Sequence, residues 1–271
     1  MRNILTRVKM DILDSKSSMI WCAIAAILIT ALMVSFFPTF QGLDADLNAY
    51  VEAFPPALLE AFGIQDTDYS NFDVFIGSEY FGFFWAVVFM PFIVGWVVKF
   101  AKEAFDGSLG ITLSYPISRS EVGLGMFISL LIKSIYCALL MVGTIMIAVR
   151  FIDADIDISN WFLFMSNVAL TFLAVSFFGA LVSILTEKPG KVTSILSAFL
   201  VGGYFVNVLA KLFEDLDLLK YLSIFYYYGE PTPILKRGEL DGFSVAVLVL
   251  FSIIMLGVGM LRIQKVNLPK G

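Results

Sequence analysis

Residues 161–185 read WFLFMSNVALTFLAVSFFGALVSIL, twenty-five positions without a charged side chain. A helix needs about 20 mostly apolar residues to cross a bilayer, so this stretch predicts a membrane span. Five other runs approach the same length, and the six runs together make up close to half of the chain. We therefore expect an all-α integral membrane protein with a single domain over residues 1–271, and with spans at about 19–37, 82–98, 122–149, 161–185, 192–210 and 243–261.

The composition supports a membrane protein and excludes several classes of site. Hydrophobic residues make up 59% of the chain and charged residues 15%, whereas soluble domains have roughly 45–50% and about 25%. The chain has no His, which excludes imidazole bases and His-ligated zinc or haem. Cys22 and Cys137 lie in apolar runs, so we expect two thiols and neither a disulfide nor a metal site. No catalytic residue, cofactor site or metal site is predicted in this chain.

The distribution of Lys and Arg predicts the orientation. Short flanking segments rich in Lys and Arg stay in the cytoplasm, and most of these residues lie on the side of the membrane that holds the N-terminus. Both termini should therefore be cytoplasmic. The lack of a cleavable signal pattern and the short connections are typical of a multi-pass protein of a prokaryotic cytoplasmic membrane. The basic residues on this side are Arg2, Arg7, Lys9, Lys16, Lys99, Lys102, Arg119, Lys188, Lys191, Arg262, Lys265 and Lys270.

The four tryptophans agree with this topology, because indole prefers the headgroup level of a bilayer. Trp21 and Trp96 fall near the predicted inner ends of their spans, and Trp85 and Trp161 near the outer ends. We expect all four to form interfacial belts. The tyrosines at 226–228 either extend the outer belt or pack against an outer loop.

Two outer segments, residues 38–81 and 211–242, are longer than tight turns. In the first, apolar residues between Leu47 and Phe62 recur every three or four positions, which predicts amphipathic helices at the interface, interrupted at Pro55 and Pro56. These helices either cover an exit path or shield the ends of the spans.

The inner segment 99–121 is neither lipid-soluble nor a minimal loop. Ser118 and Glu121 form a capping box that starts the third spanning helix, and Pro116 separates that helix from what precedes it. Before Pro116, apolar residues alternate with charges, and Gly107 and Gly110 interrupt them. We expect a short helix parallel to the membrane, followed by a turn. Such an element exposes apolar and charged groups together, which predicts a docking surface for a partner or for lipid.

The residues of this inner segment resemble a pattern in type-two ATP-binding-cassette (ABC) exporter permeases. Glu103, Asp106-Gly107-Ser108-Leu109 and Tyr115-Pro116-Ile117-Ser118-Arg119 are similar to Glu-x-x-x-Gly-Thr-Leu … Pro-[Ile/Val]-Ser-Arg after the second span of that family. Residues 53–63 (AFPPALLEAFG) look like its outer Pro-x-x-Leu-x-x-x-Phe-Gly helix. Residues 221–227 (YLSIFYY) are similar to its Leu-Ser-Pro-Phe-x-Tyr segment before the last span.

The resemblance implies the membrane subunit of an ATP-driven exporter. The chain has no phosphate-binding Gly-x-x-x-x-Gly-Lys-[Ser/Thr] loop, so ATP and Mg²⁺ would be bound by a separate cytoplasmic ATPase subunit. A second permease chain, identical or related, and the lipid bilayer are the other expected partners, and nucleic acid is not. The family's coupling helix contacts the ATPase; the candidates for that contact here are Glu103, Phe105, Asp106, Gly107, Ser108, Leu109 and Arg119.

Some of these residues have simpler interpretations. Arg119 would also suit anionic headgroups, and Gly107 would also serve as a helix stop. Within the spans, Lys133 is a candidate functional residue because ionisable groups are rare there. Alternatively, Lys133 reaches the interface or pairs with Asn167 or a lipid phosphate. Asn167 and Asn207 would bridge helices.

Other functions remain open from the sequence alone. A secondary transporter or channel driven by an ion gradient would use several ionisable residues inside its spans, and the chain offers essentially Lys133. An intramembrane enzyme would need paired carboxylates or a nucleophile and base at one depth, which the sequence lacks. A membrane scaffold would need only the docking surface.

Overall fold

The computed structural model describes residues 2–42, 68–114, 116–152, 154–186 and 188–265, and every regular element in these ranges is helical. Within these ranges, six helices are long and apolar enough to cross a membrane, in agreement with the predicted number of spans. The predicted amphipathic helices around Pro55 and Pro56 lie outside the described residues. The six long helices are α2 (Lys16–Gly42), α6 (Trp85–Phe105), α8 (Arg119–Ala148), α9 (Ile158–Thr186), α10 (Pro189–Leu212) and α13 (Gly242–Ile263).

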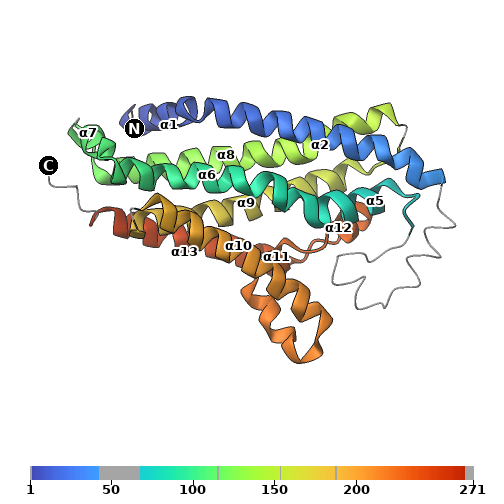
Figure 1. Cartoon of the computed structure of the whole chain (residues 1–271). Coiled ribbons are helices and arrows are strands. Elements are labelled where there is room, and N and C mark those ends of the chain that lie inside the picture. The colour runs from blue at the N-terminus through green and yellow to red at the C-terminus, as the bar shows by residue number, and fades with distance from the viewer. Residues whose placement is uncertain (1, 43–67, 115, 153, 187, 266–271) are drawn as a thin grey trace.

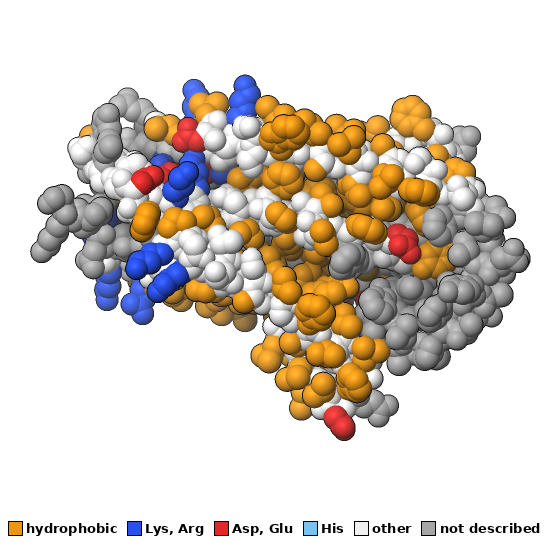
Figure 2. Space-filling view, in the orientation of Figure 1, with side chains coloured by type: hydrophobic (Ala, Val, Ile, Leu, Met, Phe, Trp, Pro, Cys, Tyr) orange, Lys and Arg blue, Asp and Glu red, His pale blue; other side chains and the backbone are white. Residues whose placement is uncertain are grey.

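Shorter helices lie at both ends of the bundle (Figure 1). We call the end where the two termini lie the basic end, because Lys and Arg side chains gather there in Figure 2, and the opposite end the far end. The basic end holds α1 (Arg2–Asp14) and α7 (Ser108–Ser114). The far end holds α5 (Phe72–Glu79), the π-helix η1 (Tyr80–Phe84), the 3₁₀ helices η2 (Val149–Phe151) and η3 (Glu214–Leu222), α11 (Ile224–Tyr228) and α12 (Pro231–Arg237).

Helix α9, which contains the apolar stretch 161–185, is the most buried of the six. A helix that is apolar on all sides belongs inside a bundle, and α9 packs against α6, α8, α10 and α13. Small side chains allow close approach: a Cβ added at Gly179 would lie 2.7 Å from Cγ1 of Val97 on α6. Helix α8 also meets α2 through the free, buried thiols of Cys22 and Cys137, whose sulfurs are 3.6 Å apart, as expected for two unpaired cysteines.

The second span is longer than predicted. Helical structure continues without a break from Phe72 through α5, η1 and α6 to Phe105, instead of ending near Val98. The reason is packing, because Phe100, Ala101 and Ala104 remain buried beyond the predicted end. The backbone N–H of Ala101 donates to Oγ of Ser183 on α9 at 2.9 Å, which fixes this extension to the bundle.

A cluster of buried rings closes the far end, and it corrects the predicted interfacial belt. Trp85 and Trp161 have no exposed surface. Trp85 stacks on Tyr228 with ring centroids 4.5 Å apart, and Trp161 contacts Phe72 and Phe81. The prediction failed because α5, α11 and α12 cover the ends of α6 and α9. Trp96 is also buried, and only Trp21, with 62% of its surface exposed, is placed as an interfacial residue would be.

Asp73 lies inside this ring cluster and accepts a hydrogen bond from Nε1 of Trp161 at 2.9 Å. Burial raises the pKa of Asp73 from 3.8 to about 6, and the carboxylates of Asp157 and Asp155 add to the effect. The Trp161 hydrogen bond and the charge of Lys236 oppose it. The folded chain therefore holds a proton on Asp73 in a pH range where the unfolded chain has released it.

Asp73→Asn is expected to stabilise the chain at pH 8 and to change little at pH 4. Because the folded-state pKa is raised, the free energy of unfolding of the native chain falls as pH rises from about 4 through 6, by at most about 3 kcal/mol from this group. The amide keeps the acceptor for Trp161 and has no proton to lose. Thermal unfolding in one detergent at pH 4, 6 and 8 measures the difference; a constant difference across these pH values would contradict the assignment.

Candidate partner-binding site at the basic end

The inner segment between the second and third spans forms a sharp, sequence-encoded turn. Helix α6 ends at Phe105, Asp106 caps it, and Gly107 adopts φ +82°, a conformation that favours glycine. Oδ1 of Asp106 accepts hydrogen bonds from Oγ of Ser108 at 2.7 Å and from its backbone N–H at 3.0 Å. Helix α7 then begins at Ser108. The expected short helix is therefore α7, which lies later in the segment than predicted because α6 occupies its first part; non-helical residues 116–118 separate α7 from α8.

The turn presents an aromatic ring and a carboxylate to the outside. Phe105 is 67% exposed, and Asp106 is exposed beside it. Leu109 points inward and is 2% exposed, so it anchors α7 to the bundle. A Cβ added at Gly107 would meet no described atom within 4 Å. Phe105, Asp106 and Gly107 therefore form the accessible part of the predicted contact set.

The N-terminal helix α1 fixes this turn to the bundle through a polar stripe with a spacing of four residues. Nδ2 of Asn3 donates to the carbonyl oxygen of Pro116 at 3.0 Å, just after α7. Arg7 forms an ion pair with Glu103, two residues before the exposed Phe105. Because the carboxylate of Glu103 is paired with Arg7, Glu103 links α6 to α1 and does not extend the exposed surface of the turn.

Asp11 continues the stripe one turn further along α1. Its Oδ2 lies 2.5 Å from Nζ of Lys133 on α8, and its Oδ1 lies 2.8 Å from Nζ of Lys99 on α6. Ser129 also donates a hydrogen bond to it. Burial acts to raise the pKa of Asp11, but the charge and hydrogen bond of Lys133 outweigh it and lower the pKa to about 2. Asp11 is therefore anionic at neutral pH.

Lys133 is fully buried and pairs with Asp11, whereas Asn167, one of the partners predicted for it, donates to the carbonyl oxygen of Tyr228 instead. Its Nζ binds Asp11 and Oγ of Ser15, and lies 5.9 Å from the ring centre of Trp96. Because Asp11 and Ser15 come before the apolar part of α2, this pairing places Lys133 level with the start of the first span. The sequence pattern could have indicated this polar stripe, because polar residues recur every four positions and so share one face of a helix. They are Asn3, Arg7, Asp11 and Ser15.

The opposite face of α1 is exposed and carries both apolar and basic side chains. Leu5, Met10 and Leu13 are 67%, 54% and 57% exposed, and Thr6 and Lys9 are exposed between them. Helix α1 thus turns its polar stripe toward the protein and its apolar side chains, with Lys9, outward, the arrangement of a helix lying at a membrane surface.

Arg119 joins the basic end to the last span. Its Nη1 donates to the carbonyl oxygen of Gln264, the C-cap of α13, at 2.8 Å. The predicted capping box next to it is confirmed: Oγ of Ser118 accepts from the N–H of Glu121 at 3.2 Å, and Oε2 of Glu121 accepts from the N–H of Ser118 at 2.8 Å. Arg119 therefore ties α8 to α13, and is partly available at the surface.

The other intramembrane polar candidates lie elsewhere. Nδ2 of Asn167 donates to the carbonyl oxygen of Tyr228 at 2.7 Å, so Asn167 bridges α9 and α11 at the far end. Asn207 lines a cavity at the far end. Lys133, Asn167 and Asn207 do not form one site.

In comparisons with known proteins, no family model and no curated protein matches the chain.

Proposed function

We propose that this chain is the membrane subunit of an ATP-driven ABC exporter, with the basic end in the cytoplasm and the turn at Phe105–Asp106 as the contact for a separate ATPase subunit. The supporting observation is the exposed ring and carboxylate on the turn between α6 and α7, which Arg7 of α1 and the buried Leu109 hold in place. Arg7, Leu109 and Arg119 connect this region to α1, the bundle and α13. An exposed Phe next to a charged surface is typical of an interface.

The fold offers a route by which motion of an ATPase would reach the far end. The turn sits directly on α6, which continues through η1 into α5 as one helical rod. The five residues of η1 form a π-helix, and such segments are common at functional sites because their hydrogen bonding is irregular. A push on Asp106 would therefore be delivered to the ring cluster around Trp85. This is a rigid-body coupling of the kind seen in switching proteins.

Charge reversal at the turn tests the proposal. The chain, tagged at its C-terminus and extracted in mild detergent, is expected to bring a nucleotide-binding ATPase with it, detected by mass spectrometry and ATP hydrolysis. Asp106→Arg and Phe105→Ala are each expected to reduce the recovered ATPase at least about tenfold, the effect of losing about 1.4 kcal/mol or more at an interface. Phe105→Ala is included because it leaves the Asp106 hydrogen bonds intact.

Asp215→Arg is the matched control, since Asp215 is an exposed carboxylate of η3 at the far end. It should leave the recovered ATPase unchanged. Recovery of the native chain without an ATPase, or equal recovery with Asp106→Arg, would contradict the proposal.

A membrane scaffold is the second candidate, because the same exposed turn would suit any cytoplasmic partner. It differs in that recovery of the partner would bring no ATP hydrolysis. A transporter driven by an ion gradient is less well supported, since Lys133 is held in a structural ion pair with Asp11.

A further inference from the structure

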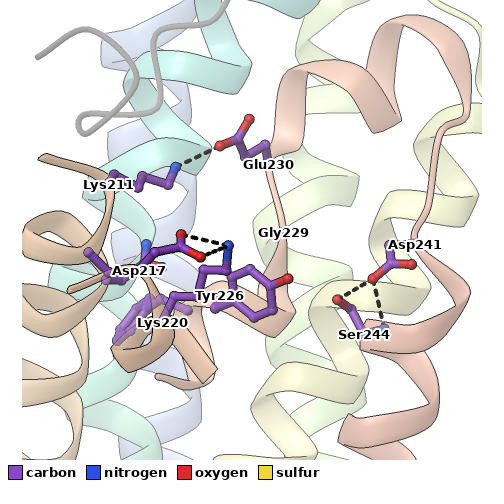
Figure 3. A pocket seen from close by; sticks show the side chains of 11 residues that line it. Lys211, Asp217, Lys220, Tyr226, Gly229, Glu230, Asp241 and Ser244 are labelled. Carbon is purple, nitrogen blue, oxygen red and sulfur yellow. Dashed lines mark hydrogen bonds and ion pairs between the residues drawn. The ribbon is translucent and has the colours of Figure 1, made fainter. Parts of the chain in front are cut away.

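A groove of about 720 Å³ runs along the bundle between α6 and α10. Its lining is almost entirely apolar, and Val87, Val201 and Phe205 in its wall are each more than half exposed. The cavity at the far end, to which Asn207 contributes, is of another kind, because it is polar and both of its lysines are paired with carboxylates of its own wall (Figure 3). The groove between α6 and α10 is therefore the one that suits an apolar ligand.

The groove is about as long as one leaflet of a bilayer is thick. On α6 it extends from Ala86 to Val98, and on α10 from Phe205 to Thr193. Each of these segments advances twelve residues, which is about 18 Å of helix. One leaflet contributes about 15 Å to the hydrocarbon core, whereas a spanning helix of another chain would need a surface of about 30 Å. The length of the groove thus matches an acyl chain better than a second helix.

The two ends of the groove differ in chemistry. Toward the basic end, its wall includes the hydroxyl-bearing side chains of Thr193 and Ser197, and toward the far end it includes the rings of Phe205 and Phe225. Between these ends, Gly95 is exposed, and a Cβ added to it would meet no described atom within 4 Å. The groove therefore becomes more apolar with distance from the basic end, as a site for a lipid tail does.

Basic side chains lie at the more polar end of the groove. Lys102 is exposed and lies four residues beyond Val98, and hence on the same face of α6. Lys188 and Lys191 are exposed at the start of α10, within five residues of Thr193. None of these three lysines forms an ion pair with a described carboxylate. Their charges are therefore available to an anionic group at this end of the groove.

We propose that the groove binds an anionic phospholipid of the leaflet at the basic end, with one acyl chain between α6 and α10 and the phosphate beside Lys102. The apolar walls and the length of the groove fit an acyl chain, and the lysines fit a headgroup with a net negative charge. A zwitterionic phospholipid with the same acyl chains shares the contact with the groove but not the attraction to the lysines.

Lipid retention by the purified chain, alone in mild detergent, tests this site. Palmitoyl-oleoyl phosphatidylglycerol and phosphatidylcholine with the same acyl chains are titrated separately, and the bound lipid is counted by native mass spectrometry. The anionic lipid is expected to be retained at least about fivefold more strongly, the effect of one Lys near an anionic headgroup. Phosphatidylglycerol with a photoreactive diazirine in one acyl chain locates the site, and its crosslinks are expected in peptides of α6 and α10.

Two variants separate the acyl chain from the headgroup. Gly95→Leu fills the groove and is expected to reduce retention of both lipids at least about tenfold. Gly257→Leu is its control, because Gly257 is exposed on α13 and has the same open space around its Cβ. Lys102→Gln is expected to reduce the preference for phosphatidylglycerol about fivefold and to leave retention of phosphatidylcholine unchanged. Lys16→Gln, at an exposed lysine at the start of α2, is the control for charge.

Four results would overturn the proposal: equal retention by Gly95→Leu and the native chain, equal losses with Gly257→Leu, no preference for phosphatidylglycerol, or crosslinks on α13 instead of α6 and α10. The mass of the native chain gives a further check. If the native chain were a dimer that Gly95→Leu converts to a monomer without loss of lipid, the groove would belong to a second copy and not to a lipid. No ATPase is present in these experiments, so their outcome is independent of the exporter proposal.

Discussion

Asp11→Asn is expected to lower the free energy of unfolding by about 3–5 kcal/mol, the effect of removing one partner from a buried ion pair. The variant leaves the ammonium of Lys133, whose side chain is 1% exposed, without its carboxylate. Ser15 and the ring of Trp96 remain near the ammonium, but neither carries a full negative charge. The same variant also releases Lys99, which is better solvated, with 22% of its side chain exposed, and keeps Asp14.

A second substitution should restore much of this loss. Asp11→Asn combined with Lys133→Met replaces the buried cation by an apolar side chain of similar length, which is often neutral or stabilising. The double variant is therefore expected to be more stable than Asp11→Asn alone. Asp14→Asn is the control: within the described part of the chain Asp14 pairs with Lys99, its side chain is 64% exposed, and the cost should be below about 1 kcal/mol.

Thermal unfolding in one detergent measures all four proteins, and the fraction of monodisperse protein after gel filtration provides a second readout. If the double variant were as unstable as Asp11→Asn, or if Asp14→Asn were as damaging, the buried pair would not be what holds α1 to the bundle.

Trp161→Ala is expected to cost about 3–5 kcal/mol, the range for truncating a buried aromatic residue. The substitution removes the ring contacts with Phe72 and Phe81, and it deprives the buried carboxylate of Asp73 of its indole donor. Trp161→Phe should cost less, because it keeps an aromatic ring and loses mainly the hydrogen bond.

Trp21→Ala is the matched control, since Trp21 is 62% exposed. Its unfolding midpoint in detergent should stay close to that of the native chain. Equal losses for Trp21→Ala and Trp161→Ala would mean that Trp161 is an interfacial residue, as the sequence had suggested, and not part of a buried cluster.

The spans were predictable because a bilayer imposes a simple requirement on length and polarity. Local signals were equally reliable: Ser118 and Glu121 form the expected capping box, and Gly107 stands where the chain turns. These features depend on residues close together in the sequence. The end of α6 was not predicted in this way: it lies at Phe105, seven residues later than expected, because Phe100, Ala101 and Ala104 pack against the bundle.

The contacts between distant residues were not predictable in this way. Hydropathy treats Lys133 as an isolated charge, because its partner Asp11 lies 122 residues away. A tryptophan at the end of an apolar run looks interfacial from the sequence whether it faces lipid or is covered by other helices. Trp161 is buried because α5 and α12 pack over α9. Repetition at four-residue intervals in α1 was the one available sign of the polar stripe.

The polar stripe of α1 also sets an order of assembly during synthesis. Helix α1 is synthesised before its partners: Arg7 must wait 96 residues for Glu103, and Asp11 must wait for Lys99 of the second span and Lys133 of the third. Before the third span is inserted, α1 can pair with the second span, but Lys133 has not yet reached Asp11. The contacts of α1 are therefore completed late, and a chain that stops before the third span would carry Asp11 without its buried partner.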